Sequence, residues 1–119
     1  MLSSYRVIEL ADERGQLAGS VLASLGADVI TVEPPGGSHS RQVGPFAGDV
    51  VSPNTSLWYW SYNRGKKSVV LDLETSEGRD ELLRLTDGAD IVIEAFGPEV
   101  LDELGLGYDV MAQRNPALI

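Results

Sequence analysis

Cysteine is absent from this sequence of 119 residues, and histidine occurs once, at His39. The lack of cysteine excludes disulfide bonds and thiolate metal sites. A single histidine leaves no His-based metal cluster, and it argues against a Ser-His-Asp catalytic triad. We therefore expect no metal centre in this chain.

Long apolar runs and basic residues are also scarce. No stretch approaches the roughly 20 apolar residues that span a bilayer, and no charged-then-apolar leader precedes a cleavage site. These features predict a cytoplasmic protein with no membrane partner. Nine basic residues stand against 18 acidic ones, which gives a formal net charge of −9. Because nucleic-acid binding needs a basic surface, we expect no nucleic-acid partner.

The sequence alternates between short apolar runs and segments of helical periodicity. Strands are predicted at residues 6–10, 28–33, 67–73 and 89–94. Helices are predicted at residues 11–25, 56–62, 77–85, 97–104 and 109–114. This alternation with apolar strands is typical of an α/β fold, a Rossmann-like doubly wound parallel sheet with helices on both faces. A chain of this length forms one domain at most.

The first helix carries its apolar residues at three- and four-residue spacing. We expect this face to pack against the sheet. Its members are Leu17, Val21, Leu22 and Leu25.

The last residues, 116–119 (PALI), are apolar and predict the beginning of a fifth strand. Two interpretations are open: Ile119 closes a small sheet as an edge strand, or further strands follow. We favour a truncated chain or a missing partner segment. A sheet without its later strands exposes an edge and an apolar face, so we also expect self-association or marginal stability.

The turn after the first strand does not fit a dinucleotide site. Such sites need three glycines where the pyrophosphate meets bare backbone at a helix N-terminus. Here Asp12 and Glu13 precede a single glycine, Gly15. Glu33 does stand where a ribose-binding acid would, but we do not favour an NAD domain. We interpret Gly19 as a point of close helix–sheet packing.

The glycine-rich loop at residues 34–46 holds Arg41 and His39. An arginine at the carboxyl edge of a parallel sheet suits a phosphate. For Arg41 this role and a solvated loop remain equally open, whereas His39 has no visible partner and is interpreted as solvated.

Two further clusters follow. The aromatic residues between positions 58 and 62 are interpreted as core or subunit interface rather than as a platform for base stacking or the lining of an acyl tunnel. The basic turn at residues 63–67 (NRGKK) is interpreted as solvated surface, with polyphosphate binding as the alternative.

Five segments, taken in order, resemble the family III CoA-transferases (the CaiB/BaiF group). This group includes formyl-CoA transferase, the carnitine CoA-transferases and α-methylacyl-CoA racemase. The segments are LGADVITVEPPGG (25–37), YNRGKKSVVLDL (62–73), SEGRDELLRL (76–85), ADIVIEAFGPEVLDELGLGYD (89–109) and NPALI (115–119).

The resemblance implies that residues 1–119 are the N-terminal part of a large Rossmann-like domain from a chain of several hundred residues. Family transferases pass coenzyme A between carboxylic acids: an aspartate attacks the acyl-CoA, and a mixed anhydride and then an aspartyl-CoA thioester form. That aspartate lies downstream of the NPALI segment, so no catalytic residue is assigned here. An acyl-CoA would be the substrate once the site is completed.

The resemblance also carries over candidate coenzyme A contacts. Leu71 and Asp72 match the LDL segment beside the nucleotide end of coenzyme A. Phe96 and Gly97 match a second segment that borders it.

This sequence departs from the family pattern at nearby positions. Glu74 and Glu103 stand where basic residues are common, Ala95 replaces an asparagine, and Pro34 replaces an arginine of some members. A carboxylate beside a phosphate repels it. Three hypotheses therefore remain: a segment of a working enzyme, a degenerate structural domain of the same family, and an unrelated nucleotide-binding Rossmann domain.

Overall fold

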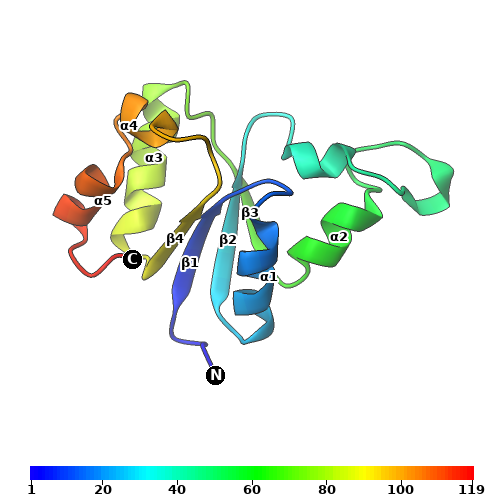
Figure 1. Cartoon of the computed structure of the whole chain (residues 1–119), viewed down its shortest axis with the longest axis horizontal. Helices are drawn as coiled ribbons and strands as arrows, with labels where there is room; N and C mark the ends of the chain where they lie inside the picture. Colours follow the sequence, from blue (N-terminus) through cyan, green and yellow to red (C-terminus); the bar gives the residue numbers. More distant parts are fainter.

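Four parallel strands form the centre of the computed structural model, which describes residues 1–119. They are β1 (Arg6–Leu10), β2 (Asp28–Glu33), β3 (Lys67–Val70) and β4 (Ile91–Glu94). The sheet order is β3-β2-β1-β4, and each neighbouring pair is parallel (Figure 1). The predicted parallel α/β fold is confirmed. β3 ends three residues earlier than expected, because Asp72 opens a turn closed by the bond from Thr75 N to Asp72 O (3.1 Å).

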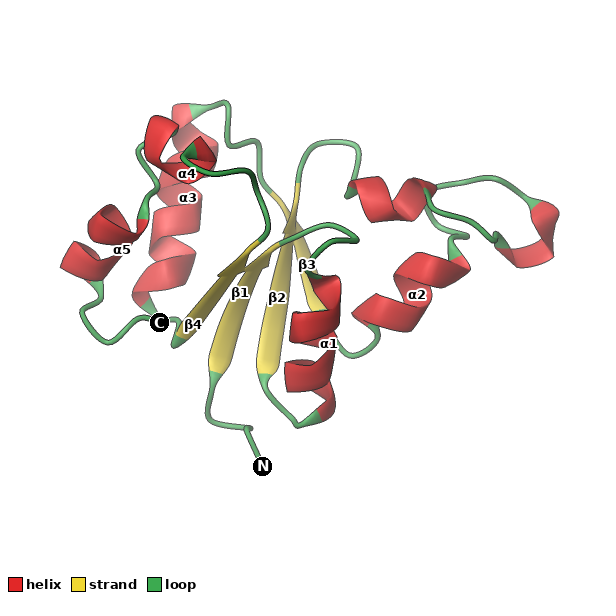
Figure 2. Ribbon diagram, in the orientation of Figure 1, coloured by secondary structure: helices red, strands yellow, loops and turns green.

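Helices cover both faces of this sheet (Figure 2). On one face lie α1 (Gln16–Ser24) and α2 (Leu57–Asn63). On the other lie α3 (Ser76–Asp87), α4 (Val100–Glu103) and α5 (Tyr108–Arg114). The long segment between β2 and α2 contains two short 3₁₀ helices, η1 (His39–Gln42) and η2 (Ala47–Asp49). No helix is both long and apolar enough to cross a bilayer.

The face under α3 and α5 is apolar. Ile8, Leu10 and Val32 point to this side and pack with Leu82 of α3 and Met111 of α5. Ile8 and Leu82 are completely buried, so this cluster is the main core. Burial of side chains of this size stabilises by about 1.5–3 kcal/mol each.

The face under α1 and α2 is largely polar. Glu9, Thr31 and Glu33 alternate with the apolar strand residues and are almost completely buried. Helix α1 meets this surface with Gln16 and Gly19, which are its buried residues.

The predicted apolar face of the first helix is therefore wrong in part. Leu17 is 61% exposed, Val21 50% and Leu25 40%, and Leu22 alone of the four packs on the small cluster around Val7 and Val29. The physical reason is the polar sheet surface: carboxylates at Glu9 and Glu33 require hydrogen-bonding partners, which leucine cannot supply.

The expected fifth strand forms only at its last residue. Ile119 N donates to Asp90 O (3.0 Å), and Val92 N donates to Ile119 O (2.9 Å), the pattern of a parallel ladder. Pro116 has no N–H, and Leu118 N closes a turn on Asn115 O (3.1 Å). The segment before Ile119 is consequently a turn, which the Asn115 side chain fixes by donating to the Thr86 and Ala89 carbonyls.

Candidate functional site

A cavity of about 310 Å³ lies at the carboxyl edge of the sheet. Residues that follow each of the four strands line it, and the strand order reverses between β1 and β4 at this edge. Ligands of open α/β sheets bind at such positions. We call it the edge pocket; its lining residues are Leu10, Ala11, Asp12, Val32, Pro34, Pro35, Ser38, His39, Leu71, Asp72, Leu73, Glu74, Phe96, Val100 and Leu104.

Three of the four predicted coenzyme A contacts line the edge pocket. Leu71 and Asp72 follow β3, and Phe96 follows β4. Gly97 borders a second cavity of about 250 Å³, where Tyr108 of α5 is a neighbour. The structure therefore brings Leu71, Asp72 and Phe96 together and leaves Gly97 outside this pocket.

The turn that carries Asp72 is held tightly against α3. Thr75 caps this helix by accepting a hydrogen bond from Gly78 N (3.0 Å), and a Cβ at Gly78 would collide with the Asp72 carbonyl. Arg79 donates to the carbonyls of Leu73 (2.9 Å) and Glu74 (3.0 Å). Hydrogen bonds between side chains and the backbone thus hold the pocket wall after β3 in place.

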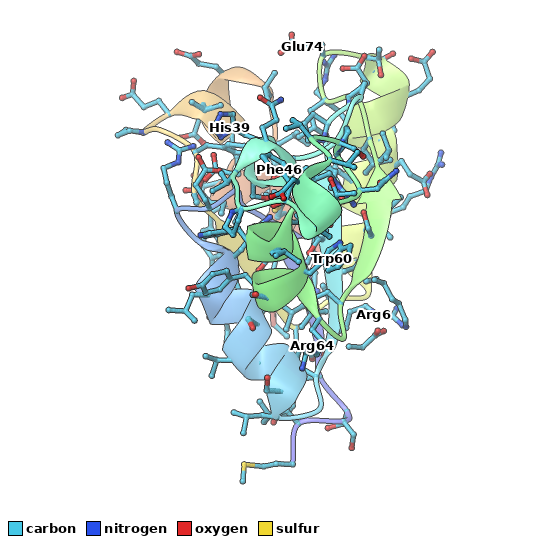
Figure 3. All side chains as sticks on the ribbon, turned by 90° about the vertical axis from the view of Figure 1, so that its right-hand side faces the viewer. Arg6, His39, Phe46, Trp60, Arg64 and Glu74 are labelled. Atoms are coloured by element: carbon cyan, nitrogen blue, oxygen red, sulfur yellow. The ribbon has the colours of Figure 1, made fainter.

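His39 has a partner that sequence reasoning missed. Its Nδ1 lies 2.7 Å from Oε1 of Glu13, and His39 lines the edge pocket. Oε2 of the same Glu13 carboxylate is buried and has no partner. The sequence could have indicated this pair, because Glu13 follows β1 and His39 follows β2. Neighbouring parallel strands end at the same edge of the sheet. In Figure 3 His39 lies towards the same end of the molecule as Glu74.

Glu33 holds the loop after β2 in place. Its carboxylate accepts hydrogen bonds from Arg41 (2.6 and 2.7 Å), Tyr59 (2.7 Å), Ser68 (2.6 Å) and Ser38 N (2.7 Å). Burial alone would raise the pKa of Glu33, but these donors, Arg41 first among them, lower the pKa to about 2. Burial beside Glu33 also raises the pKa of Tyr59. The acceptor positions of the Glu33 carboxylate are therefore filled, and none remains for a ribose hydroxyl. The Arg41 guanidinium is paired with Glu33 rather than being free for a phosphate.

A second buried ion pair joins β1 to the turn before β3. Lys66 Nζ donates to both carboxylate oxygens of Glu9 (2.9 Å each) and to the Gln16 carbonyl (2.9 Å). Burial lowers the pKa of Lys66, while Glu9 opposes that effect. A Cβ at Gly19 would collide with the Glu9 carboxylate, which confirms close helix–sheet packing at this glycine.

The aromatic residues of α2 divide between interior and surface. Tyr59 is buried on Glu33, while the rings of Trp58 and Tyr62 lie 4.3 Å apart. Trp60 is 49% exposed, and in Figure 3 it lies on the outer surface of α2. The core interpretation is therefore confirmed for Tyr59.

The basic turn does not form a phosphate site. Lys66 is internal, and Lys67 pairs with Asp28 on the sheet. Arg64 remains exposed at the end of α2, and it forms no ion pair within 4.0 Å. No three histidine, aspartate or glutamate side chains gather closely enough to hold a metal ion.

The fold and the edge pocket define a parallel α/β protein with a ligand cavity at the strand ends. The model of CoA-transferase family III matches residues 2–119. The chain therefore belongs to CoA-transferase family III.

Named relatives share this region. Over 119 residues the chain is 44% identical to "Probable fatty acyl-CoA transferase Rv3272" of Mycobacterium tuberculosis, covering 99% of this chain and 30% of the relative. The crystal structure of Rv3272 matches with a TM-score of 0.86 at 43% identity, over 100% of this chain and 32% of that one.

Two more comparisons agree. Succinate–glutarate CoA-transferase of Agrobacterium fabrum is 47% identical over 122 residues, covering 99% of this chain and 30% of the relative. A CAIB/BAIF family protein from Brucella suis matches with a TM-score of 0.87 at 38% identity, over 98% of this chain and 31% of that one. The chain thus spans about 30% of the length of the relatives it matches.

Proposed function

We propose that this chain is the N-terminal segment of a CoA-transferase, and that its edge pocket receives the nucleotide end of an acyl-CoA. The observation that carries the proposal is the convergence of Leu71, Asp72 and Phe96 on one cavity at the strand ends. Phe96 lies more than twenty positions beyond Leu71 and Asp72 in the sequence, so the fold brings two separate segments together. The relatives named as CoA-transferases support a thioester substrate.

The chemistry proposed for the whole protein is transfer of coenzyme A between carboxylic acids through an aspartyl-CoA intermediate. The attacking aspartate would come from sequence beyond Ile119. The acids that follow the strands here are already engaged or lie on turns: Asp12 pairs with Arg14 (2.7 Å), and Asp72 accepts from Glu74 N (3.0 Å). In this scheme the segment binds and orients the substrate, while bond-making residues are supplied elsewhere.

A non-catalytic domain of the same family is the second candidate. The observation that favours it is the acidic rim at Asp72 and Glu74, which would weaken binding of a polyphosphate. The two candidates differ in one measurable property, because only the first requires the edge pocket to bind coenzyme A.

Titration of the ¹⁵N-labelled chain with coenzyme A, followed by NMR, tests the proposal. The amides of Leu71, Asp72 and Phe96 should shift in a saturable manner. Phe96→Ala removes an aromatic wall and should weaken binding about tenfold, since stacking on an aromatic contributes on the order of 1–3 kcal/mol. Tyr108→Ala, an aromatic truncation at the second cavity, is the matched control and should leave affinity unchanged. Saturable shifts confined to residues outside the edge pocket would contradict the proposal.

A further inference from the structure

Two neighbouring walls of the edge pocket share no backbone hydrogen bond. One wall belongs to the turn after β1 (residues 11–15), and the other belongs to the loop after β2 (residues 34–42). Beyond the ends of the two strands, no backbone N–H of one segment donates to a carbonyl of the other. Hydrogen bonds between these walls are therefore made by side chains alone.

Gln16 makes a buried bridge between the two walls. Its side chain is completely buried at the start of α1, where Nε2 donates to Ala11 O (3.1 Å) and to Ser38 Oγ (3.4 Å). Asn63 Nδ2 donates to Oε1 of the same carboxamide (3.2 Å) and so fixes its orientation from the end of α2. Because the amide NH₂ group has two hydrogens, it satisfies one acceptor in each wall.

Glu13 makes a second bridge, closer to the surface. Its Oε1 lies 2.7 Å from Nδ1 of His39, which follows Ser38 directly in the sequence. Because an ionised carboxylate only accepts hydrogen bonds, Nδ1 carries the proton in this contact. Oε2 of Glu13 is buried without a partner, and such an atom destabilises a fold. His39 is thus the one hydrogen-bonding partner of a side chain whose position costs stability.

We propose that Gln16 and Glu13 are positioning residues that form a two-point clamp between the turn after β1 and the loop after β2. Neither side chain lines the edge pocket, so both act on it through Ala11, Ser38 and His39. The two bridges reach consecutive loop residues, so either bridge alone limits the separation of the walls. The clamp fixes the width of the pocket before a ligand enters, and such pre-organisation strengthens binding. This effect on binding rests on the proposed function, whereas the clamp itself does not.

The imidazole nitrogens of His39 report directly on the Glu13 bridge. His39 is the only histidine, so selective ¹⁵N labelling of histidine gives signals from this residue alone. At alkaline pH, where an imidazole is neutral, Nδ1 should have the shift of a protonated nitrogen and Nε2 that of an unprotonated one. Glu13→Ala should return both shifts to those of the urea-unfolded chain, whereas Glu13→Gln keeps an acceptor oxygen and should retain the native shifts. Native shifts in Glu13→Ala would overturn the proposal.

Spin labels measure the separation of the two walls. The chain has no cysteine, so labels on Leu17→Cys and Gln42→Cys are the only ones, and both positions are exposed and outside the edge pocket. Glu13→Ala or Gln16→Met alone should leave the distance distribution nearly unchanged. The two substitutions together should broaden it roughly twofold, since residues that share one task do not act additively. Additive broadening, or none in the double variant, would overturn the clamp.

The affinity for coenzyme A, measured by calorimetry, connects the clamp to binding. The double variant should bind about tenfold more weakly, and each single variant less than about threefold more weakly. Asn63→Ala removes a hydrogen bond to Gln16 without touching either wall, so it should lower stability and leave the affinity unchanged. A loss in Asn63→Ala equal to that of the double variant would overturn the positioning role. If the unmodified chain does not bind coenzyme A, the proposed function fails, while the imidazole shifts and label distances still decide the clamp.

Discussion

Glu33 and Arg41 form a two-point ion pair in which Nε and Nη2 of the guanidinium donate to different oxygens of one buried carboxylate, at 2.6 and 2.7 Å. The carboxylate is 1% exposed and the guanidinium 20%. This pair attaches the segment after β2 to the sheet. Because η1 lies in that segment, the same contact positions His39 at the edge pocket.

Acid should destabilise the protein through Glu33. Its pKa is lowered to about 2 in the folded state, so its contribution is present above the unfolded value near 4.5 and is lost as pH falls towards 2. The contribution is on the order of 3 kcal/mol. Urea unfolding between pH 7 and pH 2 measures it. Glu33→Gln should be less stable at pH 7 and should lose less stability on acidification; parallel pH profiles for both proteins would contradict this assignment.

The same substitution should destabilise the protein to very different extents at two adjacent lysines. Lys66→Met leaves the buried Glu9 carboxylate without its cation and should cost about 3–5 kcal/mol of unfolding free energy. Lys67→Met removes an exposed pair with Asp28 and should cost less than about 1 kcal/mol. Denaturant unfolding of both variants gives the comparison. Similar losses would mean that the internal pair contributes no more than a surface pair.

Gly19→Ala should destabilise the protein, although alanine is the better helix former. In an open helix this exchange would gain about 1 kcal/mol. Here the added Cβ would collide with the Glu9 carboxylate and disturb its contact with Lys66. Ser20→Ala, on the same helix, is the control and should change stability by less than about 0.5 kcal/mol. A rise in melting temperature for Gly19→Ala would show that α1 moves outward at no cost.

Self-association is predicted for the chain alone. The exposed apolar side chains of α1 and Trp60 of α2 form part of the surface that would be covered. Sedimentation velocity at increasing concentration should show oligomers, and Leu17→Lys with Val21→Lys should shift the chain towards monomer. Ser24→Lys adds the same kind of charge on an already exposed polar position of α1. A monomer at all concentrations would contradict the prediction.

Most of the architecture could be predicted from periodicity. The runs 6–10 and 28–33 become β1 and β2 with the expected bounds. These features depend on local sequence, where strand alternation and capping act over a few residues.

The polar interior could not be predicted in the same way. A glutamate in a strand is normally expected to face solvent. Glu9 is buried instead, because Lys66, 57 positions away in the sequence, forms an ion pair with its carboxylate. The inward Gln16 side chain likewise has partners distant in the sequence, Ser38 (3.4 Å) and Asn63 (3.2 Å). No local pattern contains this information, since helix spacing alone favours the leucine face.

Part of the candidate site could be predicted from the sequence. Leu71, Asp72 and Phe96 were found through the family resemblance, and they converge on one cavity. The Glu13–His39 pair was missed because His39 was interpreted as solvated. Listing the acids and bases that follow adjacent parallel strands would have paired them.

Different physical interactions hold the helices on the two faces of the sheet. The two layers of helices should therefore unfold under different conditions. The buried carboxylates of Glu9 and Glu33 hold α1, η1 and α2, whereas the buried contacts that hold α3 and α5 are apolar and include Ile8, Leu82 and Met111. Acid near pH 2, where Glu33 becomes protonated, should release the first layer while the second stays folded. Amide hydrogen exchange near pH 2 would then show rapid exchange in the first layer and slow exchange in the second, with the ligand cavity on the boundary between them.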